Sequence, residues 1–106
     1  MFKANYSPTS GIIRVVENDD PNYVAIVSIN WNGDDDVFLF GLHGEATRES
    51  LLTVFEKLYE LGARSATLTR LSGKKFPFAI KGKTKGNYTE WNIPDISMLI
   101  NILKRN

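Results

Sequence analysis

One segment constrains the fold of this chain more than any other. Residues 47–61 form an amphipathic stretch with helical spacing, in which Thr47 is a suitable N-cap, Glu49 meets the helix dipole and Gly62 provides a left-handed stop. Its large apolar side chains share one wide side: Leu51, Leu52, Val54, Phe55, Leu58, Tyr59 and Leu61. Since this side must be buried, we predict a helix that lies on a sheet and connects the strands before and after it, as a parallel crossover does.

Three strands are expected before this helix. Residues 12–17 are a β-branched run, and residues 23–31 are apolar at every second position with a half-apolar second face. The latter pattern indicates a central strand. Residues 37–42 are an unbroken apolar run, which is typical of a strand buried on both faces. Asn32-Gly33 favours a tight turn between the second and third strands.

Further elements are expected after the helix. Residues 65–71 and 76–80 resemble the strands of a hairpin, and Pro77 makes the second of these an edge strand because proline cannot donate to a ladder. Residues 81–87, KGKTKGN, are expected to be an exposed loop, and residues 88–93 a short last strand. Pro94 and Asp95 then open a closing helix with an apolar stripe: Ile96, Leu99, Ile100 and Leu103.

The predicted order is therefore β-β-β-α-β-β-(β)-α. We expect an α+β two-layer sandwich, in which a mostly antiparallel five- or six-stranded sheet has two helices on one face. The 106 residues are enough for one domain, assigned to residues 11–106, and residues 1–10 are expected to form a flexible tail.

Composition removes several chemistries. The chain has no cysteine and a single histidine, His43, so thiol nucleophiles, disulfides and histidine-rich metal sites are excluded and no cofactor is predicted. The acidic run at residues 34–36 lacks the ligand spacing of a calcium loop, and no serine has the context of a nucleophile elbow. We therefore expect a protein that is not an enzyme. No segment has the features of a signal peptide or a membrane span, so a cytoplasmic location is expected.

The net charge of +1 conceals a strong asymmetry along the chain. Residues 1–60 carry four basic and ten acidic side chains, whereas residues 61–106 carry nine basic and two acidic ones. Such asymmetry can mark a surface for a polyanion, or it can let the two halves attract each other within the fold.

The basic half contains the candidate binding residues. They are cations followed by two aromatic residues: Arg70, Lys74, Lys75, Lys81, Lys83, Lys85, Tyr88 and Trp91. Lysines on a hairpin and its following loop can neutralise phosphates, and aromatic neighbours can stack on unpaired bases. The expected function is thus a small binding module for an anionic macromolecule, either nucleic acid or an acidic protein surface. The alternative is that the lysines only keep an edge strand from aggregating while Tyr88 and Trp91 pack in the core.

Two further alternatives remain open. One is a homodimer or larger homo-oligomer formed through the edge at residues 76–80. Small size and the lack of catalytic motifs would also suit an accessory or inhibitory protein of viral type.

The other alternative comes from a resemblance. Residues 37–71, a strand, a glycine-containing turn, a helix and a strand, are similar in outline to the cofactor-binding core of the GNAT acetyltransferases. In that family the turn directs backbone amides at the pyrophosphate of acetyl-CoA. The turn here, His43-Gly44-Glu45-Ala46-Thr47-Arg48, has one glycine, no basic residue before it, and Glu45 where a polyanion would be repelled. The resemblance implies, at most, a degenerate acyl-CoA-binding domain.

Overall fold

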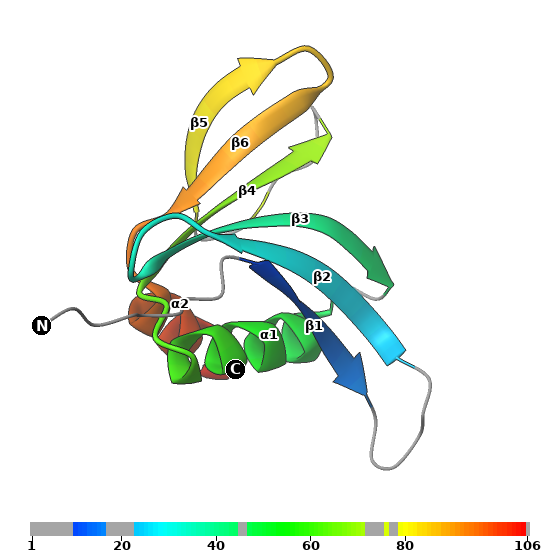
Figure 1. Ribbon diagram of the computed structural model, residues 1–106, viewed down its shortest axis with the longest axis vertical. Helices are drawn as coiled ribbons and strands as arrows, with labels where there is room; N and C mark the ends of the chain where they lie inside the picture. Colours follow the sequence, from blue (N-terminus) through cyan, green and yellow to red (C-terminus); the bar gives the residue numbers. More distant parts are fainter. Residues whose placement is uncertain (1–9, 17–22, 45–46, 72–75, 77–78, 106) are drawn as a thin grey trace, which may run out of the picture.

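The computed structural model describes residues 10–16, 23–44, 47–71, 76 and 79–105. Along the chain these residues form the following elements (Figure 1): β1 (Ser10–Val16), β2 (Tyr23–Trp31), β3 (Asp36–Gly44), α1 (Arg48–Glu60), β4 (Ser65–Leu71), β5 (Ile80–Lys85), β6 (Tyr88–Ile93) and α2 (Ile96–Lys104). The predicted α+β class and element order are confirmed, and the optional last strand is present.

The strands form one sheet in the order β1-β2-β3-β4-β6-β5. β3 and β4 pair in parallel, from Asp36 opposite Ser65 to Leu39 opposite Leu68, and every other neighbouring pair is antiparallel. The parallel pair confirms that α1 is a crossover connection. β2 is interior, as its alternation predicted, while β1 and β5 form the two edges of the sheet.

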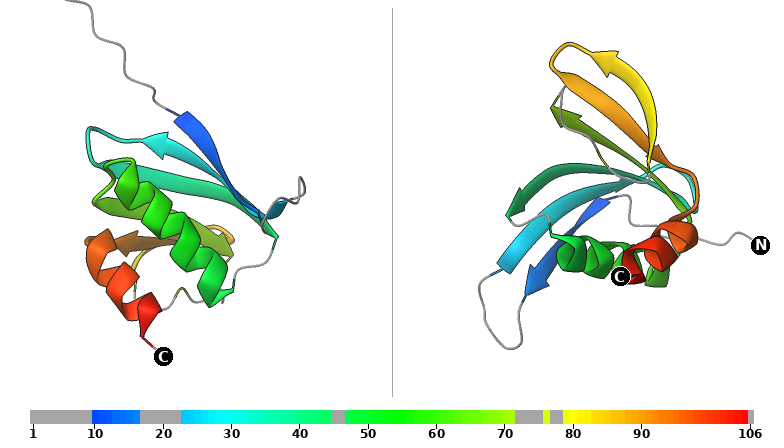
Figure 2. Two further views of the ribbon diagram at one scale, coloured as in Figure 1. Left: turned by 90° about the horizontal axis from the view of Figure 1, so that it is seen from below. Right: turned by 180° about the vertical axis from the view of Figure 1, so that it is seen from behind.

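Both helices lie on the same face of the sheet, and the β5–β6 hairpin projects away from them (Figures 1 and 2). The most completely buried large side chains come from both layers: Val37, Phe55, Leu58, Ile93 and Ile96. The helices are also joined to each other, because the Arg48 guanidinium donates to the carbonyl oxygens of Leu103 (2.9 Å) and Ile102 (2.8 Å). The helices therefore cover the apolar face of the sheet, and the sheet covers the apolar faces of the helices.

The helix ends follow the capping rules that the sequence suggested. Thr47 Oγ1 accepts a hydrogen bond from the Ser50 amide (3.1 Å) at the start of α1, and Gly62 has a φ of 107° just after its end. Asp95 caps α2, where its carboxylate accepts hydrogen bonds from the Ser97 hydroxyl (2.7 Å) and the Met98 amide (3.2 Å). These two hydrogen bonds, that of Ser97 first, lower the pKa of Asp95 below its ordinary value.

Three predictions about the strands after α1 are wrong. Residues 65–71 and 76–80 do not form a hairpin, because β4 and β5 both pair with β6, which lies between them. Residues 81–85 are not a loop, since they form most of the edge strand β5, and the edge strand begins only at Ile80. Phe76 is instead buried against Phe55, with ring centroids 6.3 Å apart in an edge-to-face arrangement. Residues 77 and 78 of the predicted strand lie outside the described residues.

The prediction that β3 is buried on both faces is also wrong. Val37 and Leu39 point into the core, but Phe38 is only half-buried and Phe40 is 40% exposed. Because both helices cover the same face, the opposite face of the sheet has no layer over it within the described part of the chain. We call this the open face.

Candidate functional site

The candidate site is built on the β5–β6 hairpin. The two-residue turn Gly86-Asn87 joins the strands, and Gly86 has a φ of 61°, a conformation that glycine adopts at little cost. Within the hairpin, the hydroxyls of Thr84 and Thr89 lie 3.2 Å apart in a hydrogen bond. A Cβ atom at Gly82 would lie 2.9 Å from Asn92 Nδ2 and 3.3 Å from the Glu90 carbonyl oxygen, so a side chain there would require the Asn92 side chain and the β6 backbone to shift.

The three lysines of β5 are all exposed: Lys81, Lys83 and Lys85. A regular strand would place them on one face, but the register shifts between Lys81 and Thr84. Lys81 lies opposite Trp91, on the helix side, whereas Lys85 lies opposite Tyr88, on the open face. The lysines therefore form a basic edge with charge on both of its sides, and we call these three residues the basic edge.

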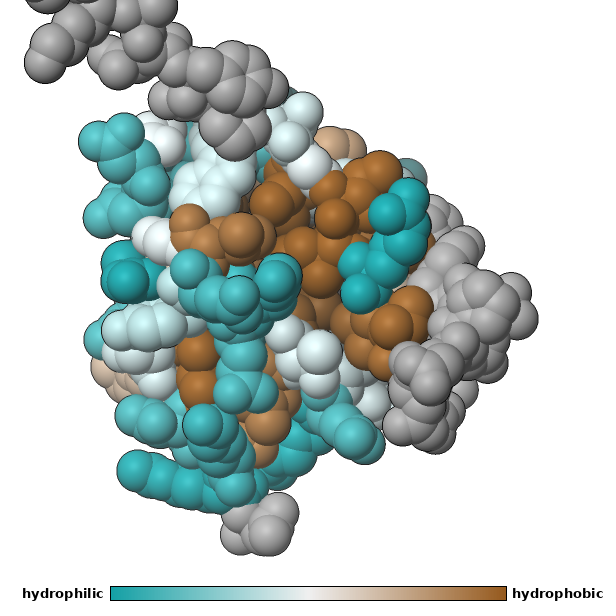
Figure 3. All heavy atoms as spheres, turned by 60° about the horizontal axis from the view of Figure 1, so that its bottom comes forward, coloured by the Kyte–Doolittle hydropathy of each residue, from teal (hydrophilic) through white to brown (hydrophobic). Residues whose placement is uncertain are grey.

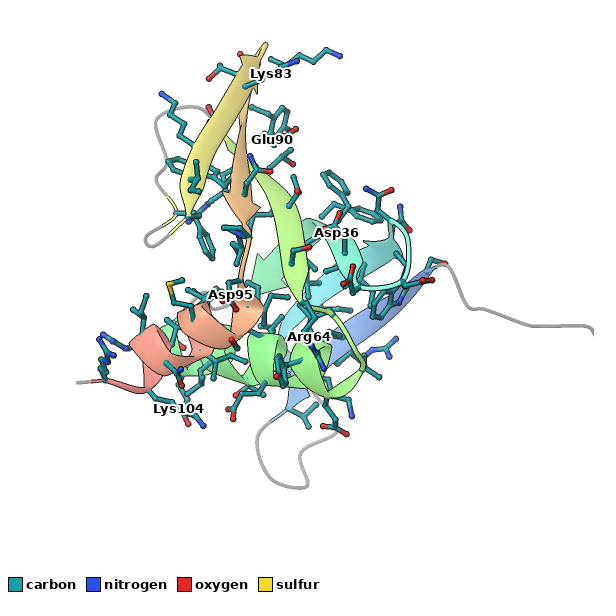
Figure 4. All side chains as sticks on the ribbon, turned by 90° about the vertical axis from the view of Figure 1, so that its left-hand side faces the viewer. Asp36, Arg64, Lys83, Glu90, Asp95 and Lys104 are labelled. Atoms are coloured by element: carbon teal, nitrogen blue, oxygen red, sulfur yellow. The ribbon has the colours of Figure 1, made fainter. Side chains whose placement is uncertain are left out.

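No lysine of the basic edge has a carboxylate oxygen within 4.0 Å among the described residues. The ion pairs within the described residues are Lys57–Glu60 at 3.3 Å and Lys104–Glu56 at 3.6 Å, and both lie on the helices. Figure 4 shows Lys83 near the end of the hairpin, away from Asp36 and Asp95, and Glu90 is the labelled carboxylate next to it. The lysines of the basic edge thus form no ion pair within the described residues.

The remaining predicted cations are not part of this edge. Arg70 on β4 is half-buried, is separated from β5 by β6, and has an interaction partner of its own. Lys74 and Lys75 lie outside the described residues. Of the six predicted cations, the structure therefore brings three together on one strand.

The two predicted aromatic residues have different surroundings. Tyr88 is 54% exposed on the open face, beside the basic edge. Trp91 is 8% exposed and packs with the core, as the alternative interpretation expected, so its ring offers no face for stacking. Its indole Nε1 is buried without a hydrogen-bond partner among the described residues.

Two aromatic residues of the open face were not among the predicted site residues. The rings of Phe38 and Phe40 stack with centroids 6.0 Å apart, and both project from β3. The apolar run at residues 37–42 suggested full burial, but it did not show that both helices would occupy one face. The sequence analysis did predict two helices on one face of the sheet. That prediction already implied that no helix would cover the second face, where Phe38 and Phe40 lie.

Between these aromatic residues the open face is polar. The Thr67 hydroxyl donates to Asn92 Oδ1 (3.1 Å), Thr69 is exposed, and Glu90 is half-buried. Amide and hydroxyl groups beside aromatic rings provide both hydrogen-bonding and stacking contacts for a flat polar ligand.

The acidic turn before β3 has a structural role. Asp36 accepts hydrogen bonds from the Ser65 hydroxyl (2.7 Å) and the Asn32 side chain (3.2 Å), and the Asp35 carbonyl oxygen accepts from the Arg64 amide (2.7 Å). These bonds fix the start of β4 beside β3. The described residues contain no group of three or more His, Asp or Glu side chains that could hold a metal ion.

The turn that resembles the GNAT family is described only in part. Gly44 is the last residue of β3 and Thr47 caps α1, while Glu45 and Ala46 lie outside the described residues.

No protein-family model matches the chain, and no curated protein is significantly similar to it. Among the described helices, none is long and apolar enough to cross a bilayer.

Proposed function

We propose that this protein is a non-enzymatic binding module that holds an anionic macromolecule, and that the favoured partner is a single strand of nucleic acid. The observation that carries the proposal is the basic edge, whose three exposed lysines have no carboxylate within 4.0 Å in the described part of the chain. Unpaired lysines on one strand can neutralise successive phosphates without reading sequence. A cytoplasmic location, which the sequence analysis expected, is part of the same proposal.

Single-stranded nucleic acid fits the open face better than an acidic protein does. Tyr88 lies beside the basic edge on the open face, which also carries Phe40. Base-aromatic stacking needs unpaired bases, while lysines along the strand follow the backbone. An acidic protein surface would use the lysines but would leave these rings without a matching partner.

The proposal is tested by fluorescence anisotropy with a labelled single-stranded oligonucleotide. Three lysine contacts predict that affinity falls about 20-fold between about 50 mM and about 200 mM salt. The triple variant Lys81→Glu, Lys83→Glu, Lys85→Glu should lose binding while it keeps its melting temperature. Its matched control is Arg14→Glu, Lys57→Glu, Lys104→Glu, which has the same net charge and should retain most of the affinity.

Two results would contradict the proposal. One is the absence of oligonucleotide binding at low salt, and the other is an equal loss of affinity in both triple variants. If polyglutamate binds instead of the oligonucleotide and requires the same lysines, then the partner is an acidic protein.

Self-association is a second candidate, favoured by one observation. Ile80 is 61% exposed at the start of the edge strand β5, and an edge strand can pair with another copy. The lysines that follow oppose such pairing through like-charge repulsion. We therefore expect a monomer in sedimentation velocity at low salt, and a concentration-dependent dimer that Ile80→Lys abolishes would favour self-association.

Acyl-CoA binding also has one observation in its favour. β3 and β4 pair only from Asp36 to Leu39 of β3, although β3 continues to Gly44. The strands therefore lose their pairing before α1 begins. Glu49 in the first turn of α1 disfavours a pyrophosphate there, so we expect acetyl-CoA to leave the melting temperature unchanged, and a clear rise would support cofactor binding.

A further inference from the structure

A groove lies along the other edge of the sheet, away from the basic edge. It has a volume of about 610 Å³ and opens between β1 and α1, on the helix side where apolar side chains gather (Figure 3). Ile13, Ile29 and Trp31 contribute apolar surface, and residues 10–14 of β1 form one side. The opposite side is a row on α1 and its C-cap, spaced four residues apart: Thr53, Lys57 and Leu61.

Gly11 leaves space in the part of the groove beside β1. Gly11 pairs with Ile29 and alternates with the buried Ile13 and Val15, so a side chain there would point toward the helices. A Cβ at Gly11 would meet the Ile29 side chain at 3.7 Å, an ordinary contact, and Gly11 has no positive φ. Neither backbone strain nor a clash requires glycine here, and its effect is to leave space beside β1.

The two sides of the groove have matching lengths. From Ser10 to Arg14, β1 rises four steps of 3.4 Å, about 14 Å. From Thr53 to Leu61, the α1 row rises eight steps of 1.5 Å, about 12 Å. Among the described strands β1 is an edge strand, so its outer backbone N–H and C=O groups pair with no strand there, and the groove beside it is long enough for about four extended residues.

We propose that this groove binds an extended peptide segment of a partner protein, which adds to β1 as a further strand. Backbone hydrogen bonds to β1 hold the segment, and alternate side chains of the segment enter the apolar space above Ile13 and Ile29. This function is separate from nucleic-acid binding at the opposite edge.

Charge defines the chemistry of the segment. Arg14 lines one end of the groove and has no carboxylate within 4.0 Å among the described residues, whereas Asp34 lines the groove near its other end. An acidic side chain beside Arg14 therefore complements the groove. A second copy of β1, SGIIRVV, has no acidic residue and would bring its own arginine to a basic site. The favoured occupant is thus a partner segment that is apolar at alternate positions and acidic near Arg14.

Selection from a display library of random decapeptides tests the proposal. We expect enrichment of peptides with alternating apolar residues and an acidic residue. Gly11→Val, which places a branched side chain in the groove, should weaken the selected peptides by at least about tenfold, because that side chain occupies space which the bound strand needs. Thr84→Val on the opposite edge is the matched control and should bind as the wild type does, as should the Lys81, Lys83, Lys85 triple variant.

A charge exchange keeps the test valid even if Gly11→Val fails to fold. Arg14→Glu should reject the acidic peptides by about tenfold and accept the same peptides with lysine in place of the acid. Recovery of binding by the exchanged pair would support the proposal. Failure to select any binder, or selected peptides that bind the wild type and Arg14→Glu equally, would overturn it. A dimer that forms without peptide and disappears in Gly11→Val would instead assign the groove to a second copy.

Discussion

At the scale of single residues, Gly82 lies where the basic edge and β6 approach each other closely. The position faces Asn92 and Glu90 across the hairpin, and there is no room for a Cβ atom without movement of one of them. The register shift between Lys81 and Thr84 occurs at the same place. One glycine thus allows the irregular pairing that distributes the lysines over both sides of the strand.

Gly82→Val should therefore destabilise the hairpin. The branched side chain would displace Asn92 or the β6 backbone, with an expected cost of about 1–3 kcal/mol in the free energy of unfolding. Urea denaturation measures this cost, and Gly33→Val, at a position with a φ of 93° and no atom within 4 Å of a Cβ, separates backbone strain from crowding. An unchanged denaturation midpoint in Gly82→Val would contradict the close approach seen in the hairpin.

Asp95 gives the protein a defined dependence on pH. Its pKa is lowered in the fold, mainly by the Ser97 hydroxyl and then by the Met98 amide. Its stabilising contribution is present above its unfolded pKa and is lost as the pH falls through the lower folded value. Asp95→Asn, which keeps a capping oxygen, should reduce the fall in melting temperature below about pH 4. Equal acid sensitivity of the wild type and Asp95→Asn would contradict this assignment.

At the scale of elements, the helices were the most predictable parts. Both have an N-cap, a buried stripe and an end signal within a short window, so local sequence determines them. The strand β5 was not predictable in this way, because KGKTK lacks apolar alternation and is a strand only through its pairing with β6. Long-range pairing overrides weak local preference in such segments.

The candidate site was predicted only in part. The run of lysines at residues 81–85 was visible in the sequence, but the register shift that divides them between two sides was not. The burial of Trp91 and the exposure of Phe40 depend on which face the helices cover, and this is a property of the assembled sheet. Arg70 is close to the lysines in sequence but lies two strands away from β5.

The first turn of α1 allows a test at this scale. Thr47→Ala removes the oxygen that accepts from the Ser50 amide, and we expect a loss of about 1 kcal/mol in the free energy of unfolding. Thr53→Ala is the control, since Thr53 is exposed on the same helix and donates only to the Glu49 carbonyl oxygen. Thermal denaturation that shifts equally in both variants would show that the cap has no special role.

The open face makes a separate prediction about stacking. Phe40→Ala and Tyr88→Ala should each lower oligonucleotide affinity, by about 1–3 kcal/mol if the ring stacks on a base. Each exposed ring contributes less than a core residue to folding, so the circular dichroism spectrum should be unchanged. The control is Tyr59→Ala, an aromatic residue of similar exposure on α1. Full affinity in both open-face variants would remove stacking from the account and leave only the lysines.

At the scale of the whole molecule, the two edges of the sheet have different chemistry. β5 carries lysines with no carboxylate partner in the described residues, whereas β1 borders an apolar groove with an arginine at one end. Since four strands separate these edges, the two proposed partners would not compete for the same surface. The two proposals thus place one partner at each edge of the sheet.

The central claim is that the basic edge and the adjoining open face bind the anionic partner. Nuclear magnetic resonance of the labelled protein during titration with a single-stranded oligonucleotide tests it most directly. We predict that the largest amide shift changes occur at residues 81–85 and 88–90, with smaller changes at residues 38–40 and none along β1. Changes centred on the helices or on β1, or no changes at low salt, would contradict the account.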